Sequence, residues 1–355
     1  MSALGSEVRR PAGSVGLDGS AWTGRRGPLR WGGWLLLIAV GYLLPWILGG
    51  SDRIVTTCVL IAIFAIMSYG LDLVLSYLGE VSLGHTLLWA AGAYLTAITA
   101  VRLGWSPIPA LLAALAAASA LASVLGLATI RTREFVFSLV TYAAAVIGLT
   151  VVSNSAFFGG TDGLVGIPLL SLPALDGQYV ARSNADFWPI AYLALVLVIA
   201  LISRFRHSKL GVTALMAQMN PDLATSLGVD VRRTRVLVFV LSAPVAALAG
   251  WLYAYQRSYV SPDLLSPYFL LFMLTAVILP GRRLLLGPLV GAVLLTSQQE
   301  LASLGGDADK IVLGGVLAAV LLLSPDGLAG IWRRIMRRGG GRKVRTAGDE
   351  AEQWA

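Results

Sequence analysis

The residues best suited to chemistry lie in one glycine-rich stretch, SYLGEVSLGHTLLWAAGA, at residues 76–93. It contains Glu80 and His85, and Asp72 lies shortly before it. These carboxylates could pair with the histidine or meet a substrate ammonium group. The surrounding sequence is apolar, and an acid within a membrane costs at least about 2.5 kcal/mol on insertion scales. We therefore expect these groups to face protein or water rather than lipid.

The sequence leaves three arrangements of the two carboxylates open. Both could be solvated at the cytoplasmic interface, both could line a path or a helix break, or they could pair within their own helix. The glycines favour a break over a continuous helix, and we expect breaks near residues 79–84 and 281–291. His85 alone is more often a hydrogen-bonded structural residue than a ligand.

Catalytic motifs are missing from the chain. There is no Walker A pattern, no HExxH, no GxSxG and no GxGxxG after a strand, so we expect no ATP hydrolysis by this chain and no enzyme activity. Cys58 is the single cysteine, and the two histidines, His85 and His207, lie on different segments. This excludes an internal disulfide and argues against a metal or haem site. We expect no cofactor.

The composition is that of a polytopic helical membrane protein. Hydrophobic residues make up 57% of the 355 residues and charged residues only 13%, whereas a soluble domain has about 25% charged residues. Apolar runs of about 20 residues recur along the chain, each long enough to cross a bilayer. The β-barrel alternative would show alternating segments of about 10 residues, which the sequence lacks.

We predict an all-α fold with ten spans and with both termini in the cytoplasm. In this arrangement only Arg53, Arg102, Arg182, Arg257 and Lys310 of the 27 basic residues lie outside, as expected when positive charge is retained inside. The basic residues therefore indicate a membrane rather than nucleic acid. The predicted spans are 31–50, 54–75, 85–103, 107–130, 135–153, 187–204, 236–256, 265–281, 284–300 and 311–331.

Three regions follow from this topology. We expect a disordered basic cytoplasmic tail at 1–30, a transmembrane domain at 31–331 and a cytoplasmic tail at 332–355. No cleavable signal peptide is visible, because the first apolar run begins at Trp31 and no cleavage site follows it.

A long inside loop at residues 205–235 contains a candidate docking element. Residues 211–228 predict an amphipathic helix broken at Asn220–Pro221, with Asn220 as a cap, Pro221 in the first turn and Gly228 ending the helix. We expect Ala224 and Leu227 to share a face with Leu223. The element could dock a soluble partner, or it could be an ordinary loop whose arginines only follow the positive-inside rule.

Seven ordered blocks resemble the permeases of branched-chain amino acid ABC importers, specifically the LivM type. The blocks are GLDLVLSYLGEVSLGH with GAYLTA (70–85 and 92–97), REFVFSLVTYA (133–143), FGGTDGLVGIP (158–168), SKLGVTALMAQMNPDLATSLGVDVRRTRVLVFVLSAPVAALAGWLYA (208–254), YVSPDLLS (259–266), GPLVGA (287–292) and SPDGLAGI (324–331). Each is weak alone, but together they cover about residues 55–331 in order. The resemblance implies an ABC importer permease fold in a bacterial inner membrane.

The resemblance also implies a set of partners. These are a second homologous permease, two ABC ATPase subunits that bind ATP, and an extracytoplasmic substrate-binding protein. It assigns the ATPase contact to Gly211, Asn220, Pro221, Asp222, Ala224, Leu227 and Gly228. It places the external loop, with Gly159, Gly160, Gly163, Gly166 and Pro168, near the binding protein. We expect the path or helix break at Asp72, Gly79, Glu80, Ser82, Gly84, His85, Gly287 and Gly291.

The chain departs from the family mainly in charge. Where the family usually has Asn and Gln, this chain has Asp72 and Glu80, and Gln218 and Pro221 occupy positions that are often charged. Residues 280–283 are Pro-Gly-Arg-Arg in place of a glycine pair, and Asp326 replaces a frequent arginine. These differences weaken any assignment of substrate.

The predicted function is a permease subunit that moves branched-chain amino acids or a related small polar substrate by ATP-driven alternating access. An ion-coupled secondary transporter, an ABC permease for urea or amides, and a non-transporting scaffold remain alternatives. Recovery with ABC ATPases and a second permease would separate an ABC permease from a secondary transporter or a scaffold. The substrate, and whether the permease pair consists of like or unlike subunits, stay open.

Overall fold

The computed structural model describes residues 28–129, 134–174, 177–301, 311–312 and 315. The contacts divide the chain into a unit that ends at Leu44 and a unit that begins at Pro45. The predicted tails lie almost entirely outside the described residues, as does most of the tenth predicted span. The first unit contributes most of α1 (Pro28–Ile47), which includes Pro45 near its end. The rest of the description concerns the second unit.

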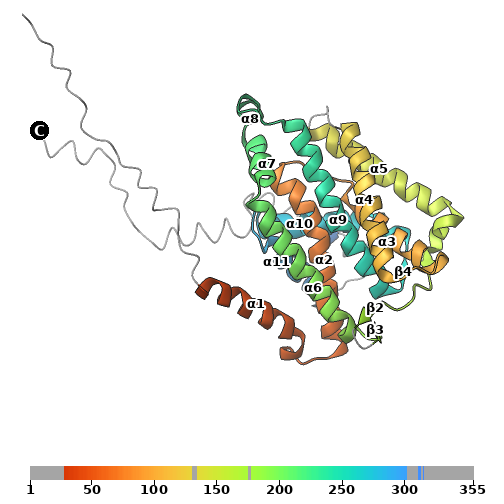
Figure 1. The fold of residues 1–355 in the computed structure, drawn as a ribbon. Helices are drawn as coiled ribbons and strands as arrows, with labels where there is room; N and C mark the ends of the chain where they lie inside the picture. Colours follow the sequence, from red (N-terminus) through yellow and green to blue (C-terminus); the bar gives the residue numbers. More distant parts are fainter. Residues whose placement is uncertain (1–27, 130–133, 175–176, 302–310, 313–314, 316–355) are drawn as a thin grey trace, which may run out of the picture. The chain divides into compact units, whose positions relative to one another are not determined.

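The second unit is predominantly helical, as predicted (Figure 1). Its α-helices are α2 (Asp52–Tyr77), α3 (His85–Arg102), α4 (Pro107–Thr129), α5 (Glu134–Asn154), α6 (Asn184–Arg206), α7 (Lys209–Met219), α8 (Pro221–Ser226), α9 (Val231–Arg257), α10 (Pro267–Ile278) and α11 (Gly287–Leu301). Three short 3-10 helices are η2 (Ala156–Phe158), η3 (Gly160–Asp162) and η4 (Pro262–Leu265).

The prediction of an all-α fold is wrong in one respect, because the described residues include two small antiparallel sheets. β1 (Leu164–Val165) pairs with β4 (Tyr259–Val260), with Leu164 opposite Val260. β2 (Ser171–Ala174) and β3 (Gly177–Val180) form a hairpin. These short segments pair with each other, so that their backbone N–H and C=O groups form hydrogen bonds without a helix. The sequence pattern did not reveal this pairing.

Within the part of the chain that the structure describes, five helices are long and apolar enough to cross a membrane: α2, α4, α5, α6 and α9. Each matches a predicted span to within a few residues. α10 and the described part of α11 have 12 and 15 residues, fewer than the roughly 20 that a bilayer requires. The predicted spans 265–281 and 284–300 therefore contain shorter helices. The count of ten spans and the orientation stay predictions.

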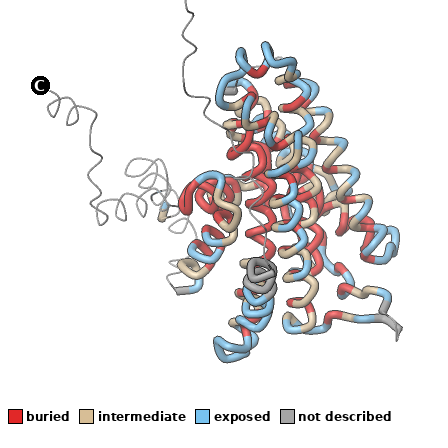
Figure 2. The backbone as a smooth tube through the Cα atoms, turned by 60° about the vertical axis from the view of Figure 1, so that its left-hand side comes forward, coloured by how far each residue is buried: buried red, intermediate tan, exposed pale blue. Residues whose placement is uncertain are grey.

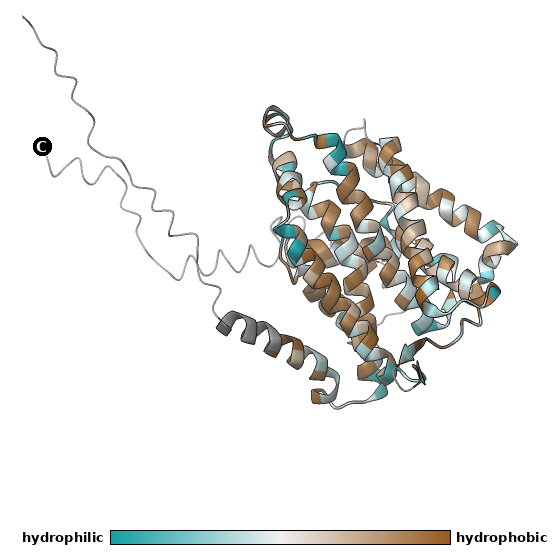
Figure 3. Ribbon diagram, in the orientation of Figure 1, coloured by the Kyte–Doolittle hydropathy of each residue, from teal (hydrophilic) through white to brown (hydrophobic). Residues whose placement is uncertain are grey.

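α2 is the central helix of the unit. In its most apolar window 94% of the residues are buried, and Figure 2 shows the buried positions concentrated along the inner helices. Its sequence is apolar on all sides, as expected for a helix that is surrounded by others. α4, α5 and α6 are instead largely exposed on one side, and Figure 3 shows that the helices are hydrophobic over most of their length. Such exposed apolar faces suit lipid or other subunits.

Small residues allow the inner helices to approach closely. Gly92 of α3 and Gly250 of α9 face each other, and a methyl group on either would overlap the backbone of the opposite helix at Ala247 or Trp89. α4 packs on α9 and has fully buried alanines at every fourth position, Ala110, Ala114, Ala118 and Ala122. Close backbone contact is how helices associate where no hydrophobic effect drives them together.

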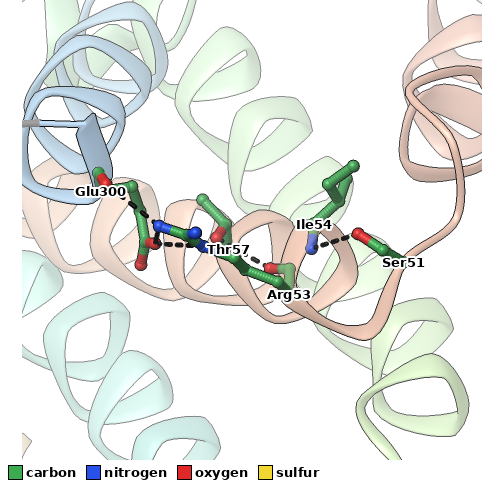
Figure 4. A network of polar contacts seen from close by, with 5 residues as sticks. All are labelled: Ser51, Arg53, Ile54, Thr57 and Glu300. Atoms are coloured by element: carbon green, nitrogen blue, oxygen red, sulfur yellow. Dashed lines mark hydrogen bonds and ion pairs between the residues drawn. The ribbon is translucent and has the colours of Figure 1, made fainter.

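The two ends of the bundle carry different structures. At one end, called the strand end here, the sheet formed by β1 and β4 lies with the starts of α2 and α6. There Asn184 of α6 donates a hydrogen bond of 2.8 Å to Thr56 of α2. Arg53 of α2 also bonds the carboxylate and the carbonyl of Glu300 in α11 at 3.2 and 3.1 Å (Figure 4). The other end, called the α7–α8 end, holds α7, α8, the start of α9 and the end of α2 (Figure 1).

Replacing Gly250 by alanine should destabilise the protein by about 2–3 kcal/mol, because the added methyl would meet backbone atoms that cannot move aside. Gly126→Ala is the matched control, since its methyl would meet only side-chain atoms of Val236 and Phe239 at 3.3 Å or more. Thermal unfolding in detergent measures both variants. Equal stability of the two variants would contradict the proposed helix contact.

Candidate functional site

Asp72 begins a polar chain at the α7–α8 end. Its side chain lies in α2 with 3% exposure and accepts a hydrogen bond of 2.5 Å from the hydroxyl of Ser76, one turn later. The same hydroxyl oxygen accepts the backbone N–H of Arg283 at 3.2 Å, and the arginine Nε donates to the Ser76 carbonyl at 3.3 Å. Pairing within the helix, one of the three predicted arrangements, is therefore present for Asp72.

Glu80 forms an ion pair with Arg235, which lies in the second turn of α9. The glutamate side chain is only 4% exposed, and that of the arginine is 23% exposed. The predicted alternative in which both carboxylates are solvated at the cytoplasmic interface is therefore wrong. Both side chains are buried, and both have partners. Glu80 pairs with an arginine from a distant segment rather than with His85.

The turn between α2 and α3 spans residues 78–84 and is held against its neighbours. Gly79 has a φ of +75°, a backbone conformation that favours glycine. Gly84 precedes α3, and a side chain there would overlap the backbone of Thr141 in α5. Ser138 donates a hydrogen bond of 2.6 Å to the carbonyl of Val81. The turn is therefore a fixed, buried interruption between two helices.

Two polar residues of this region have no hydrogen-bond partner within the described part of the chain. They are Ser82, through its hydroxyl, and His85, through both ring nitrogens. Both residues are fully buried, and the imidazole packs against Gly70 and the ring of Phe239. Buried polar groups are ordinarily hydrogen-bonded, so such atoms call for an explanation.

A second interruption lies between α10 and α11, at residues 279–286. It is shorter than the predicted break at 281–291, because α11 begins at Gly287. Gly291 lies within α11, where a side chain would overlap the backbone of Ala276 in α10. Gly291 is therefore a packing residue, and Gly287 is the helix start.

The element at residues 209–228 has the predicted break. Asn220 caps α8 by accepting the N–H of Leu223 at 2.9 Å, Pro221 occupies the first turn, and Gly228 follows with a φ of +84°. Gly211 packs against the carbonyl of Phe205, and Asp222 is exposed.

The predicted common face of Leu223, Ala224 and Leu227 is wrong for Ala224. Ala224 is buried, whereas Leu223 and Leu227 are 56% and 68% exposed. Ala224 packs against the protein, and the two leucines face the surface. Together with Met216 and Met219, which are 45% and 74% exposed, they form an apolar surface that we call the α7–α8 surface.

The predicted external loop lies at the strand end. Gly159 and Gly163 have φ values of +85° and +76°. Side chains at these positions would overlap the backbone of Gly163 and Val260 respectively, so the glycines allow the loop to lie against β4. Tyr259 adds a hydrogen bond of 3.1 Å to the carbonyl of Asp162. Gly160 also has a positive φ, Gly166 has open space around it, and Pro168 is exposed.

A mainly apolar cavity of about 50 Å³ lies between α3, α5 and the start of α10. Its lining includes the polar residues Thr86, Tyr142 and Ser266. The apolar walls are formed by Leu83, Ala145, Val146, Leu149, Leu265, Pro267 and Leu270.

The family model "Branched-chain amino acid transport system / permease component" matches residues 53–323. The chain belongs to this family. It is therefore a multi-pass membrane protein and, like its family, a transport permease component. The match begins at α2 and includes both helix interruptions, the α7–α8 element and the external loop.

Curated relatives agree with this assignment. The high-affinity branched-chain amino acid permease LivM of Escherichia coli K12 is 28% identical over 318 residues, covering 83% of this chain and 73% of the relative. LivH of the same organism is 24% identical, covering 75% and 91%. The xylose/arabinose import permease XylH of Sulfolobus acidocaldarius is 24% identical, covering 77% and 78%. No solved structure matches the chain.

The residue pattern alone does not identify the partners of the buried acids. It interprets Arg235 either as a neighbour of the docking element or as a charge that follows the positive-inside rule, and it assigns no role to Ser76. One signal was available for each: Glu80 and Arg235 were predicted on the same side of the membrane, and Ser76 follows Asp72 at the spacing of one helical turn.

Replacing Arg235 by alanine should lower the free energy of unfolding by about 3–5 kcal/mol, because Glu80 would remain buried without its counter-charge. The double variant Glu80→Gln/Arg235→Gln should recover most of this loss. Thermal unfolding in detergent measures the series, and Arg232→Ala, at an exposed position of the same helix, is the control. A double variant no more stable than Arg235→Ala would contradict the ion pair's role.

Proposed function

We propose that this chain is a membrane-spanning permease subunit of an ATP-driven importer in a bacterial inner membrane. Membership of the permease family is the observation that carries the proposal. The partners would be a second permease, two ABC ATPase subunits that bind the ATP, and an extracytoplasmic substrate-binding protein. The chain itself would contribute the path for the substrate and would bind no cofactor.

The α7–α8 surface supports docking of the ATPase subunits. Met219, Leu223 and Leu227 expose apolar side chains on two short helices that follow α6 and precede α9. Exposed apolar groups that cluster in this way mark contact sites for other proteins. The cap at Asn220 and the buried Ala224 hold α8 in place, so the surface is presented on a defined scaffold.

At the opposite end, the external loop would meet the binding protein. Its backbone is fixed by pairing with β4, while Val165 and Pro168 remain exposed. A rigid and exposed loop is suited to receive a partner with little loss of conformational entropy.

The interruptions at 78–84 and 279–286 would border the substrate path. Transporters place irregular backbone and its polar groups along such paths. The unsatisfied polar atoms of Ser82 and His85 support this location, because water or a polar substrate would supply their missing partners. ATP-driven movement of the docked ATPases would then open the path alternately to each side.

A small amino acid with an aliphatic side chain is the substrate that we propose. The LivM and LivH relatives are named as branched-chain amino acid permeases, but XylH is named for sugars. The description of the matching family, a branched-chain amino acid transport permease component, favours the former.

Leu223→Asp should abolish co-purification of the partner ABC ATPases, because a charge would be buried at the docking surface. The control is Val165→Asp, which adds the same charge to a similarly exposed apolar residue at the strand end. Affinity purification after co-expression measures the effect. Retention of ATPases by the Leu223 variant would show that docking uses another surface.

The complete complex should accumulate labelled leucine in proteoliposomes only when ATP and the partner binding protein are supplied. Uptake driven by an ion gradient without ATP would indicate a secondary transporter instead. Uptake of urea or amides, with none of leucine, would retain the importer but overturn the substrate. Competition among unlabelled amino acids, sugars, urea and amides measures this choice.

A further inference from the structure

Gln218 connects the α7–α8 element to both helix interruptions. Its Oε1 accepts a hydrogen bond of 2.7 Å from the guanidinium of Arg283, in the turn between α10 and α11. Its amide nitrogen lies against Gly79, in the turn between α2 and α3, where an added Cβ would be 2.9 Å away. One side chain of α7 therefore contacts two turns that are far apart in the sequence.

Arg283 extends this connection into the buried part of the bundle. Its backbone N–H bonds the Ser76 hydroxyl at 3.2 Å and its Nε bonds the Ser76 carbonyl at 3.3 Å. Ser76 is fully buried and donates to Asp72. The order of contacts is thus Gln218, Arg283, Ser76 and Asp72, from the surface to the interior of α2.

The backbone of Arg283 shows that this arrangement is specifically maintained. Its φ is +65°, in a region that residues with a side chain seldom occupy, and glycine would adopt it more readily. Such a conformation persists where surrounding contacts hold it. Here the contacts are those to Ser76 and Gln218, so a bulky charged residue occupies a position at which the backbone alone would favour glycine.

The remaining contacts of α7 differ in kind. Ala214 and Ala217 are buried and pack through apolar surfaces, which have little directional preference. Hydrogen bonds from a guanidinium fix both distance and angle. A displacement of α7 would therefore move the turn at Arg283, and through it Ser76, more directly than it would move helices in apolar contact.

We propose that the chain of contacts Gln218–Arg283–Ser76–Asp72 transmits movement of the α7–α8 element to the end of α2. Arg283 is then a positioning residue that couples ATP hydrolysis to transport. This inference rests on the proposed function. The hydrogen bond between Gln218 and Arg283 lies at the exposed surface, where a single polar contact adds little stability, so its removal leaves the fold intact.

The test uses the full complex in proteoliposomes and measures substrate molecules imported per ATP hydrolysed. Arg283→Gly removes the side chain while favouring the backbone conformation. It should lower this ratio about tenfold, with the ATPases still bound and hydrolysing ATP. Gln218→Ala should have a similar effect, and the double variant should be no worse than either single variant. Gln218→Glu should keep the ratio, because a carboxylate accepts the same hydrogen bond.

The matched control is Arg282→Ala, which removes the same charge from the neighbouring exposed position and should leave the ratio unchanged. The proposal is overturned if Arg283→Gly transports as efficiently as the wild type, or if the two single effects multiply. It is also overturned if ATP hydrolysis and uptake fall together at a constant ratio, since that indicates a merely structural role. A wild-type complex without ATP-dependent uptake would instead refute the proposed function itself.

Discussion

The close approach of α3 and α9 is the contact on which the rest of the bundle depends. Gly92 and Gly250 bring the two backbones together, and α2 and α4 pack against the same helix α9. In a membrane, where lipid is as apolar as the side chains, this proximity provides the packing that holds helices together. The same helix α9 carries Arg235, which pairs with Glu80 near the helix start.

Two buried carboxylates are stabilised in different ways at the α7–α8 end. Glu80 has a full counter-charge, while Asp72 has a hydroxyl that is bonded in turn to the backbone of Arg283. The desolvation of a buried charge is offset only by such close partners. Both arrangements join segments that are distant in sequence, so the polar groups also define how these segments meet.

Together these features separate the roles of the two ends. The strand end is held by backbone pairing and by contacts such as that of Arg53 with Glu300, whereas the α7–α8 end exposes apolar side chains above a polar network. A rigid end and an end built from short helices and turns are consistent with a subunit that receives a partner on each side. The chain belongs to a family of transport permease components, and the proposed function uses this difference between the two ends.

The sequence by itself determined the membrane class, the long helices, the interruption near Gly79 and the cap at Asn220. These features depend on local hydrophobicity, backbone conformation and hydrogen bonds between near neighbours. Only the tertiary structure decided that Glu80 pairs with Arg235, that Ala224 faces inward while Leu223 and Leu227 face outward, and that Gln218 reaches Arg283. Such contacts depend on how distant helices cross, and helix crossing is set by packing that no single segment contains.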